Sequence, residues 1–145
     1  SLAFVRNHEN IEMLSLNRCK QFNDVFSLST LKKLRVLDLR KSGINNLRGL
    51  SMLDNLETIF LGATRIDDLF ELSKMPTLNI IDLEECDSVR DLTPLLELPS
   101  LEKLNINSII QRENQRVVEI SRTGNSDIPI TTIPEPLKEK FGYRL

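Results

Sequence analysis

The 145-residue sequence lacks most of the side chains from which catalytic centres are built. It contains one histidine, two cysteines, one tyrosine and no tryptophan. The single His8 is too little for histidine-based acid–base chemistry. The motifs GxSxG, HExxH and GxGxxG are absent, as is the phosphate-binding P-loop. The sequence therefore predicts a protein that is not an enzyme and needs no cofactor.

The charge balance and the hydrophobic runs argue against two further kinds of partner. The net charge is −2, without the basic stripe and interleaved aromatics that nucleic-acid binders usually carry. No apolar run approaches the roughly 20 residues of a membrane-spanning helix. The first residues also lack the basic and apolar stretches of a signal peptide. We therefore expect neither a nucleic acid nor a membrane as the partner.

What the sequence does contain is a repeat of aliphatic residues. Units begin at Ile11, Leu34, Leu56, Leu78 and Leu101, so their starts lie 23, 22, 22 and 23 residues apart. The fifth unit breaks down soon after its start. Leu2 and Val5 also fit the pattern, and His8 stands where it requires leucine. We expect the sequence to begin inside a repeat, as a fragment or with a degenerate first repeat, and His8 to be a half-buried structural residue. The second unit shows every apolar position: Leu34, Leu37, Leu39, Ile44, Leu47, Leu50 and Leu53.

The spacing within each unit predicts its structure. Leu37 and Leu39 are two residues apart and so share one face of a short strand. The remaining apolar positions, three apart, suit a tight 3-10-like return. One unit cannot bury its apolar side alone, so units stack around a continuous core. We therefore predict an α/β solenoid, with a parallel sheet on the concave face and short returns on the convex face. The predicted strands are 13–15, 36–38, 58–60, 80–82 and 103–105.

The pattern LxxLxLxx(C/S/T)x(x)(I/V)xxL over residues 2–108 resembles the leucine-rich repeat. The short period, with Asp-Leu at Asp68 and Asp91 and variants at Asn46 and Asp24, is similar to repeats of phosphatase-1 regulatory subunits and internalins. The cysteine-bearing units also resemble repeats of trypanosomatid and plant immune-receptor proteins. The resemblance implies a horseshoe-shaped arc. It implies little about function, because this fold carries many unrelated roles.

The two cysteines occupy equivalent positions three repeats apart, in a turn that carries Cys19, Ser42, Thr64, Cys86 and Ile109 in the five units. Strands ~4.8 Å apart place the two cysteines about 14 Å apart, whereas a disulfide needs Cα atoms within about 7 Å. Two cysteines do not make a zinc site either. We expect two free thiols, buried as small turn residues. Free thiols without a glycosylation sequon favour an intracellular location, in the cytoplasm or nucleus.

An acidic cluster follows the fourth predicted strand, formed by Asp82, Glu84, Glu85 and Asp87. Carboxylates suit a hard cation. However, alternate strand residues face apart, and no second group of ligands lies at loop spacing. We favour a solvated acidic edge over a metal site.

Strand residues between the core leucines project from the predicted concave face, which is the candidate binding surface. Its early part is basic and its late part acidic, so we expect a bipolar partner protein, acidic at the first end and basic at the second. One offset carries Met13, Val36, Thr58, Ile80 and Lys103; the next carries Ser15, Asp38, Phe60, Asp82 and Asn105. The candidate partner-binding residues are Met13, Arg18, Val36, Asp38, Arg40, Lys41, Thr58, Phe60, Ile80, Asp82, Glu84 and Glu85.

Phe60 takes the outward position that aspartates fill in the adjacent units. An exposed aromatic between Val36 and Ile80 is typical of the residues that dominate protein interfaces. The small Gly62 and Ala63 leave room for a partner to approach. The alternative is that Phe60 merely covers neighbouring strands or packs on another part of a longer chain.

The last part of the sequence, 109–145, departs from the repeat, which we assign to residues 1–108. Ile109–Ser121 has two β-prone runs around a polar turn, which predicts a hairpin. Pro136 to Phe141 could form one short helix ended by Gly142, with Leu137 and Phe141 on one face. We expect this segment to cap the open end of the core, or else to dock on another protein. The protein would be a monomer unless the segment docks in trans.

Three functions follow from these observations. The first is a scaffold or adaptor that binds a protein on the concave face. The second is a ligand-recognition domain of a larger receptor or immune-type protein. The third, a regulatory subunit of an enzyme, has no support from particular residues.

Overall fold

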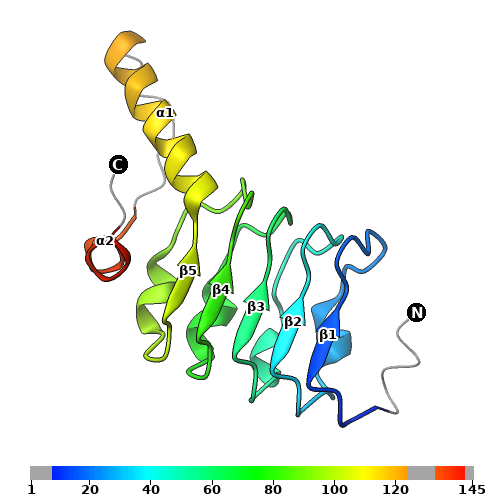
Figure 1. Ribbon diagram of the computed structural model, residues 1–145. Coiled ribbons are helices and arrows are strands. Elements are labelled where there is room, and N and C mark those ends of the chain that lie inside the picture. Colours follow the sequence, from blue (N-terminus) through cyan, green and yellow to red (C-terminus); the bar gives the residue numbers. More distant parts are fainter. Residues whose placement is uncertain (1–7, 124–132, 143–145) are drawn as a thin grey trace.

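Residues 8–123 and 133–142 are described by the computed structural model, which gives the backbone alone for 117–123. Five short strands follow one another as a parallel sheet in chain order (Figure 1). Every strand lies where the repeat predicts it. The strands are β1 (Met13–Ser15), β2 (Val36–Asp38), β3 (Thr58–Phe60), β4 (Ile80–Asp82) and β5 (Lys103–Asn105).

The chain returns from each of the first four strands through a 3-10 helix on the other side of the core. Just before or at the start of each return, a side-chain oxygen accepts the backbone N–H two residues further on, at 2.8–3.1 Å. The acceptors are Asp24, Asn46, Asp68 and Asp91, and these local turns are the physical reason for the recurring Asp-Leu and Asn-Leu pairs. The helices are η2 (Val25–Leu28), η3 (Leu50–Met52), η4 (Phe70–Lys74) and η5 (Thr93–Glu97).

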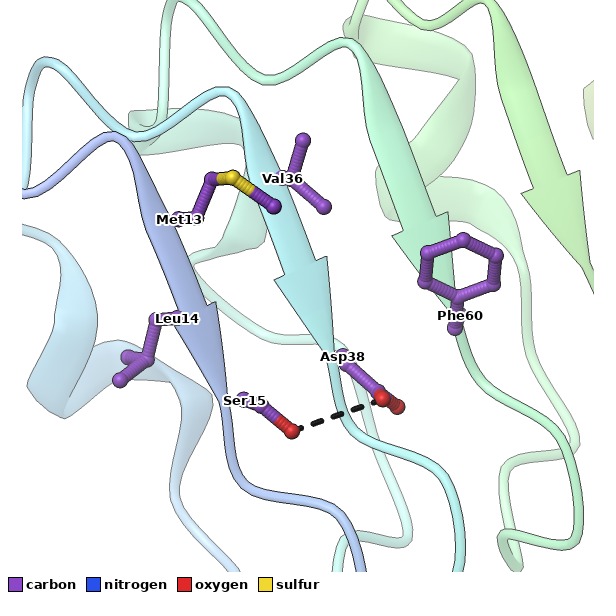
Figure 2. A pocket seen from close by; sticks show the side chains of 6 residues that line it. All are labelled: Met13, Leu14, Ser15, Val36, Asp38 and Phe60. Atoms are coloured by element: carbon purple, nitrogen blue, oxygen red, sulfur yellow. Dashed lines mark hydrogen bonds between the residues drawn. The ribbon is translucent and has the colours of Figure 1, made fainter.

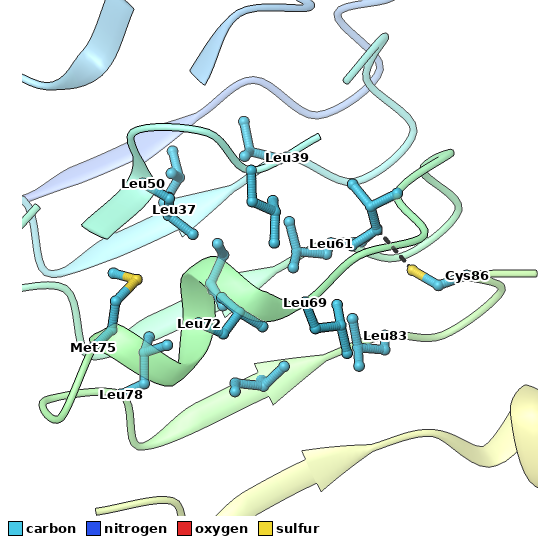
Figure 3. Packing of buried hydrophobic residues seen from close by; sticks show 14 of the residues in the cluster. Leu37, Leu39, Leu50, Leu61, Leu69, Leu72, Met75, Leu78, Leu83 and Cys86 are labelled. Atoms are coloured by element: carbon cyan, nitrogen blue, oxygen red, sulfur yellow. Dashed lines mark hydrogen bonds between the residues drawn. The ribbon is translucent and has the colours of Figure 1, made fainter. Parts of the chain in front are cut away.

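The core is a continuous column of leucine and isoleucine between the sheet and the returns (Figure 3). The inward residues of the central strands and the leucines just after them are at most 1% exposed, as the repeat predicts. These are Leu37, Leu39, Ile59, Leu61, Ile81 and Leu83.

A left-handed turn follows each of the first four strands. Arg18, Lys41, Ala63 and Glu85 have φ between 56° and 63°, a conformation that costs a non-glycine residue about 1–2 kcal/mol. The turn persists because neighbouring repeats bond through it: the N–H of Ala63 donates to the carbonyl of Glu84 at 2.7 Å. At the last of these turns, Glu85 N–H donates instead to Oγ of Ser108 at 2.7 Å.

The turn position shared by the cysteines is buried in the inner repeats and open in the first. Cys86 is fully buried and its thiol donates to the carbonyl of Leu61 in the preceding repeat at 3.2 Å. Thr64 Oγ1 donates to the same carbonyl at 2.6 Å. Cys19 is exposed, so the prediction that both thiols are buried was wrong for it. β1 is the first strand described, and no described repeat covers that side of it. His8, predicted to be half-buried, is exposed as well.

The two cysteines are both free thiols and should react very differently. Burial raises the pKa of Cys86 to about 11, so at neutral pH very little of it is the reactive thiolate. We expect a thiol reagent to modify one cysteine, Cys19, in the folded protein and both after denaturation. Mass mapping of the labelled peptides checks this. Rapid native labelling of Cys86 would contradict the packing of the third and fourth repeats.

The segment after β5 corrects the sequence prediction, because residues 107–123 form the helix α1 (Asn107–Thr123) and not a hairpin. The β-branched residues of this stretch suggested strands, yet Ile106, Ile109, Ile110 and Glu113 are spaced at i, i+3, i+4 and i+7. Ile109 and Glu113 are buried, and Ile110 packs on the core. Tertiary contact therefore overrides the local β-propensity.

A buried carboxylate holds the first half of α1 in place. Glu113 is fully buried, and its Oε1 accepts from Nε of Arg112 and Nη1 of Arg116, each at 3.1 Å. Arg112 also donates to the carbonyls of Asp87 at 2.8 Å and Val89 at 3.2 Å. α1 is thus tied to the turn after β4 through charge-assisted hydrogen bonds, which are stronger than neutral ones.

The short helix α2 (Glu135–Phe141) lies close to its predicted bounds and ends at Gly142, whose φ is 70°. Leu137 is buried, and Phe141 packs on the core from the same face. Ile133, just before α2, is also part of the core. Among the described residues, no helix is long and apolar enough to cross a membrane.

Candidate functional site on the concave face

The first outward residues of β1–β4 form a largely apolar strip across the sheet, which ends at the charged Lys103 of β5. The register pairs Met13 with Val36, Val36 with Thr58, Thr58 with Ile80, and Ile80 with Lys103. Met13 is 71% exposed, whereas the next three are half-buried and Lys103 is exposed. An apolar strip of this kind at the centre of a sheet suits contact with another protein.

The first three strands surround a hollow of about 340 Å³. Met13, Val36, Asp38 and Phe60 line it, and all four were predicted site residues (Figure 2). Leu14 and Ser15 complete the lining. Sequence reasoning missed Leu14 because its offset assigns it to the core. Its partial exposure follows from its place on the first strand described, where the sheet has an open side.

Asp38 and Arg40 form a closed pair at the end of β2. Arg40 donates through Nε to Oδ1 at 3.0 Å and through Nη2 to Oδ2 at 2.7 Å, and its backbone N–H donates to Oδ1 at 3.1 Å. Ser15 Oγ adds a contact to Oδ2 at 3.5 Å (Figure 2). The hydrogen bonds from Arg40 lower the pKa of Asp38. The hydrogen bond to Asp38, with the nearby charges of Asp38 and Asp82, raises the pKa of Arg40.

The ring of Phe60 lies against this pair. The Cζ atom of Arg40 is 5.1 Å from the ring centroid, a cation–π distance, and Phe60 itself is half-buried. Asp38 and Asp82 are its register partners on the two neighbouring strands. Arg40 is therefore held between a carboxylate and an aromatic ring of its own chain, and its charge is largely compensated there.

Phe60 interrupts a hydrogen-bonded turn that the other four strands share. At the last strand position, Ser15, Asp38, Asp82 and Asn105 each accept the backbone N–H two residues on, at 2.9–3.4 Å. Phenylalanine has no acceptor, so β3 lacks this side-chain hydrogen bond, although its left-handed turn at Ala63 is kept. Among the strands described, β3 is thus the one whose last side chain accepts no hydrogen bond from the backbone of the following turn.

Neither the family models nor the curated proteins contain a match to this sequence. Solved structures do match. Internalin C2 from Listeria monocytogenes superposes with a TM-score of 0.61 and 26% identity, over 71% of this chain and 45% of that chain. An internalin, InlF, from the same organism gives a TM-score of 0.53 and 19% identity, over 78% of this chain and 42% of that chain. Both are built from leucine-rich repeats.

The chain has the leucine-rich repeat fold. The matched internalin folds, the parallel sheet and the 3-10 returns all agree with the repeat pattern. The chain spans less than half the length of these two internalins.

The remaining predicted residues of this leucine-rich repeat fold lie along the edge where the strands end. Asp82 and Glu84 are half-buried, and Asp82 Oδ1 accepts the backbone N–H of Glu84 at 2.9 Å. Arg18, Lys41 and Glu85 stand exposed in the left-handed turns and do not line the hollow. Across the described parts of the chain, no three His, Cys, Asp or Glu side chains are grouped as metal ligands would be.

Proposed function

We propose that this leucine-rich repeat array is a protein-binding module of the scaffold or adaptor type, which holds its partner on the concave face around Phe60. The observation that carries the proposal is the departure at the end of β3. Serine, aspartate or asparagine would supply a turn-forming acceptor there, as on the four other strands described. The chain instead places a half-buried aromatic ring beside the hollow.

Two further features support a partner at this place. Met13, at the rim of the hollow, is 71% exposed, although burial of a methionine side chain is favourable. The apolar strip continues through Val36, Thr58 and Ile80 along the sheet. An aromatic residue flanked by aliphatic ones in a recess is the usual centre of a protein interface. The proposal assigns no catalytic step to the chain.

Replacing Phe60 by alanine should weaken partner binding by about 2 kcal/mol or more, because the ring would be desolvated at the centre of the interface. Proteins recovered with the wild-type chain in a pull-down provide the partner. Its Kd for the wild-type and Phe60→Ala chains is then measured by titration calorimetry.

Phe70→Ala is the matched control for this measurement. Phe70 is 58% exposed, lies on η4 at the convex side and contacts Lys74, so its loss removes a similar ring from the other face. We expect the Phe70→Ala chain to bind like the wild type. Equal affinities of the wild-type and Phe60→Ala chains would contradict the proposal and point to the segment after Ser108.

A further inference from the structure

The turns that follow the first three strands carry basic side chains and no acidic ones. Neither aspartate nor glutamate occurs in these turns, which are residues 17–22, 39–45 and 61–66. The equivalent turn after β4, residues 83–89, contains Glu84, Glu85 and Asp87. All four turns lie along the edge of the sheet from which α1 leaves (Figure 1). This edge therefore changes from basic to acidic at the fourth repeat.

Four of the five basic side chains in these turns are exposed and unpaired. The fifth, Arg40, is bound to Asp38. Among the described residues, none of the other four forms an ion pair, and this includes Asp24 and Asp67, the next carboxylates in sequence after the first and third turns. The four are Arg18, Lys20, Lys41 and Arg65. Their charges are therefore open to a ligand.

The backbone holds these side chains beside one another. Arg18 and Lys41 occupy the left-handed position of adjacent turns, with φ of 63° and 57°. The N–H of Arg18 donates to the carbonyl of Arg40 at 2.8 Å, which bonds the first turn to the second. The N–H of Lys41 donates to the carbonyl of Gly62 at 2.9 Å, which bonds the second turn to the third. The basic side chains thus project from three turns joined by hydrogen bonds.

Gly43 leaves the middle of this basic group without a side chain. It stands at the position that Lys20 occupies in the first repeat and Arg65 in the third. A Cβ atom at Gly43 would collide with the carbonyl oxygen of Lys20, so the close stacking of the two turns requires glycine. With strands ~4.8 Å apart, the backbones of Lys20 and Arg65 lie roughly 10 Å apart. An extended segment of about three residues spans that distance.

We propose that the basic edge, formed by Arg18, Lys20, Lys41 and Arg65, binds a short acidic segment of a partner protein. The proposal rests on the proposed function, to which it adds the charge of the partner beside the concave face. It keeps the expectation that the partner is acidic at the first end of the array. However, it assigns that contact to the turns, and it adds Lys20 and Arg65 in place of Arg40.

A protein segment is favoured over a nucleic acid by the length and the chemistry of the basic edge. Glu85 continues the row of Arg18 and Lys41 in the fourth repeat, so it would repel a polyanion that followed the edge further. The three basic turns also present no exposed aromatic side chain on which a base could stack, since Phe22 is buried. A few carboxylates match this charge pattern better than a chain of phosphates.

The test uses a probe peptide and the full chain. Acetyl-Glu-Glu-Glu-Glu-amide is titrated into the ¹⁵N-labelled protein at low ionic strength, and the amide shifts of Lys20, Gly43 and Arg65 are followed by NMR. Acetyl-Gln-Gln-Gln-Gln-amide has nearly the same shape and no charge. We expect the glutamate peptide to shift these amides and to bind at least about tenfold more tightly than the glutamine peptide. Added salt should weaken this binding, because it screens exposed charges.

The double variant Lys20→Gln with Lys41→Gln tests the position of the site. The matched control, Lys33→Gln with Lys103→Gln, removes the same charge from exposed residues away from the basic edge, before β2 and at the start of β5. We expect the first variant to lose at least about fivefold in affinity for the glutamate peptide, and the control to lose less than about twofold. Equal losses would mean that net charge alone attracts the peptide, which would overturn the proposal.

Three further outcomes would overturn the proposal. They are no shift at these amides, equal binding of the two peptides, and binding of a thymidine pentanucleotide of the same charge at these amides as tightly as the glutamate peptide. Each is distinguishable from failure of the proposed function, which is judged by the Phe60→Ala chain and the captured partner. If Phe60→Ala loses the partner while the glutamate peptide does not bind near Gly43, the concave face binds a partner without this acidic segment.

Discussion

Replacing Glu113 by alanine should lower the free energy of unfolding by about 3–5 kcal/mol, since it removes one side of a buried ion pair. Glu113 is fully buried and accepts hydrogen bonds from Arg112 and Arg116. Burial, and then the charges of Arg112 and Arg116, already lower the pKa of the nearby Arg90. Without Glu113, these three positive charges would lie close together without its compensating negative charge. Urea denaturation followed by circular dichroism measures the loss.

Glu135→Ala is the control for Glu113→Ala. Glu135 pairs with Lys138 at 2.7 Å on the surface of α2, with 73% of the acidic side chain exposed. Exposed pairs contribute about 0–1 kcal/mol, so this variant should unfold close to the wild type. A loss below about 1 kcal/mol for Glu113→Ala would show that the Glu113 carboxylate contributes little to holding α1 in place.

Leu61→Ala should cost roughly 2–5 kcal/mol of unfolding free energy. Leu61 is fully buried at the centre of the column (Figure 3). Its backbone carbonyl accepts hydrogen bonds from Thr64 of its own repeat and Cys86 of the next repeat. Truncation leaves a cavity between repeats that stack only on their neighbours, so the loss cannot be spread over a larger core.

Thr58→Ala, on the same repeat, is the comparison for Leu61→Ala. Thr58 is half-buried and projects from the other face of the sheet. Surface substitutions usually change the free energy of unfolding by no more than about 0.5 kcal/mol. Similar losses for the two variants would mean that the faces of β3 are misassigned, since a shift of one residue exchanges them.

The sequence was sufficient to predict the strands and the core, because both follow from one spacing repeated five times. Leu37 and Leu39 are assigned to the core by their offset, and the same offset repeated at Ile59 and Leu61 removes the ambiguity of a single short strand. The prediction failed at the end of the array, where no second copy was available. There the β-branched residues led to the prediction of strands, although the spacing of Ile106, Ile109 and Glu113 is that of a helix.

The outward placement of the candidate residues could be predicted from the sequence, but the pairing of their charges could not. The repeat register identified Phe60, Asp38 and Arg40 as outward residues. It could not show that Arg40 folds back onto Asp38, because that pairing depends on side-chain geometry at i, i+2 beyond the strand. One signal was available: Ser15, Asp38, Asp82 and Asn105 are all turn-forming residues, so Phe60 stands out as the exception.

The strand-end turn also bears on how this surface can change during evolution. Four of its positions are constrained by stability, because Ser15, Asp38, Asp82 and Asn105 supply acceptors to their own backbone. The side chain at the position of Phe60 supplies no acceptor to the backbone, so stability does not constrain it in this way. We expect mutations there to alter partner preference at little cost in stability, and mutations at the other four to be removed by selection before their effect on binding matters. Specificity would then diverge first at the third repeat, from the middle of the array outward.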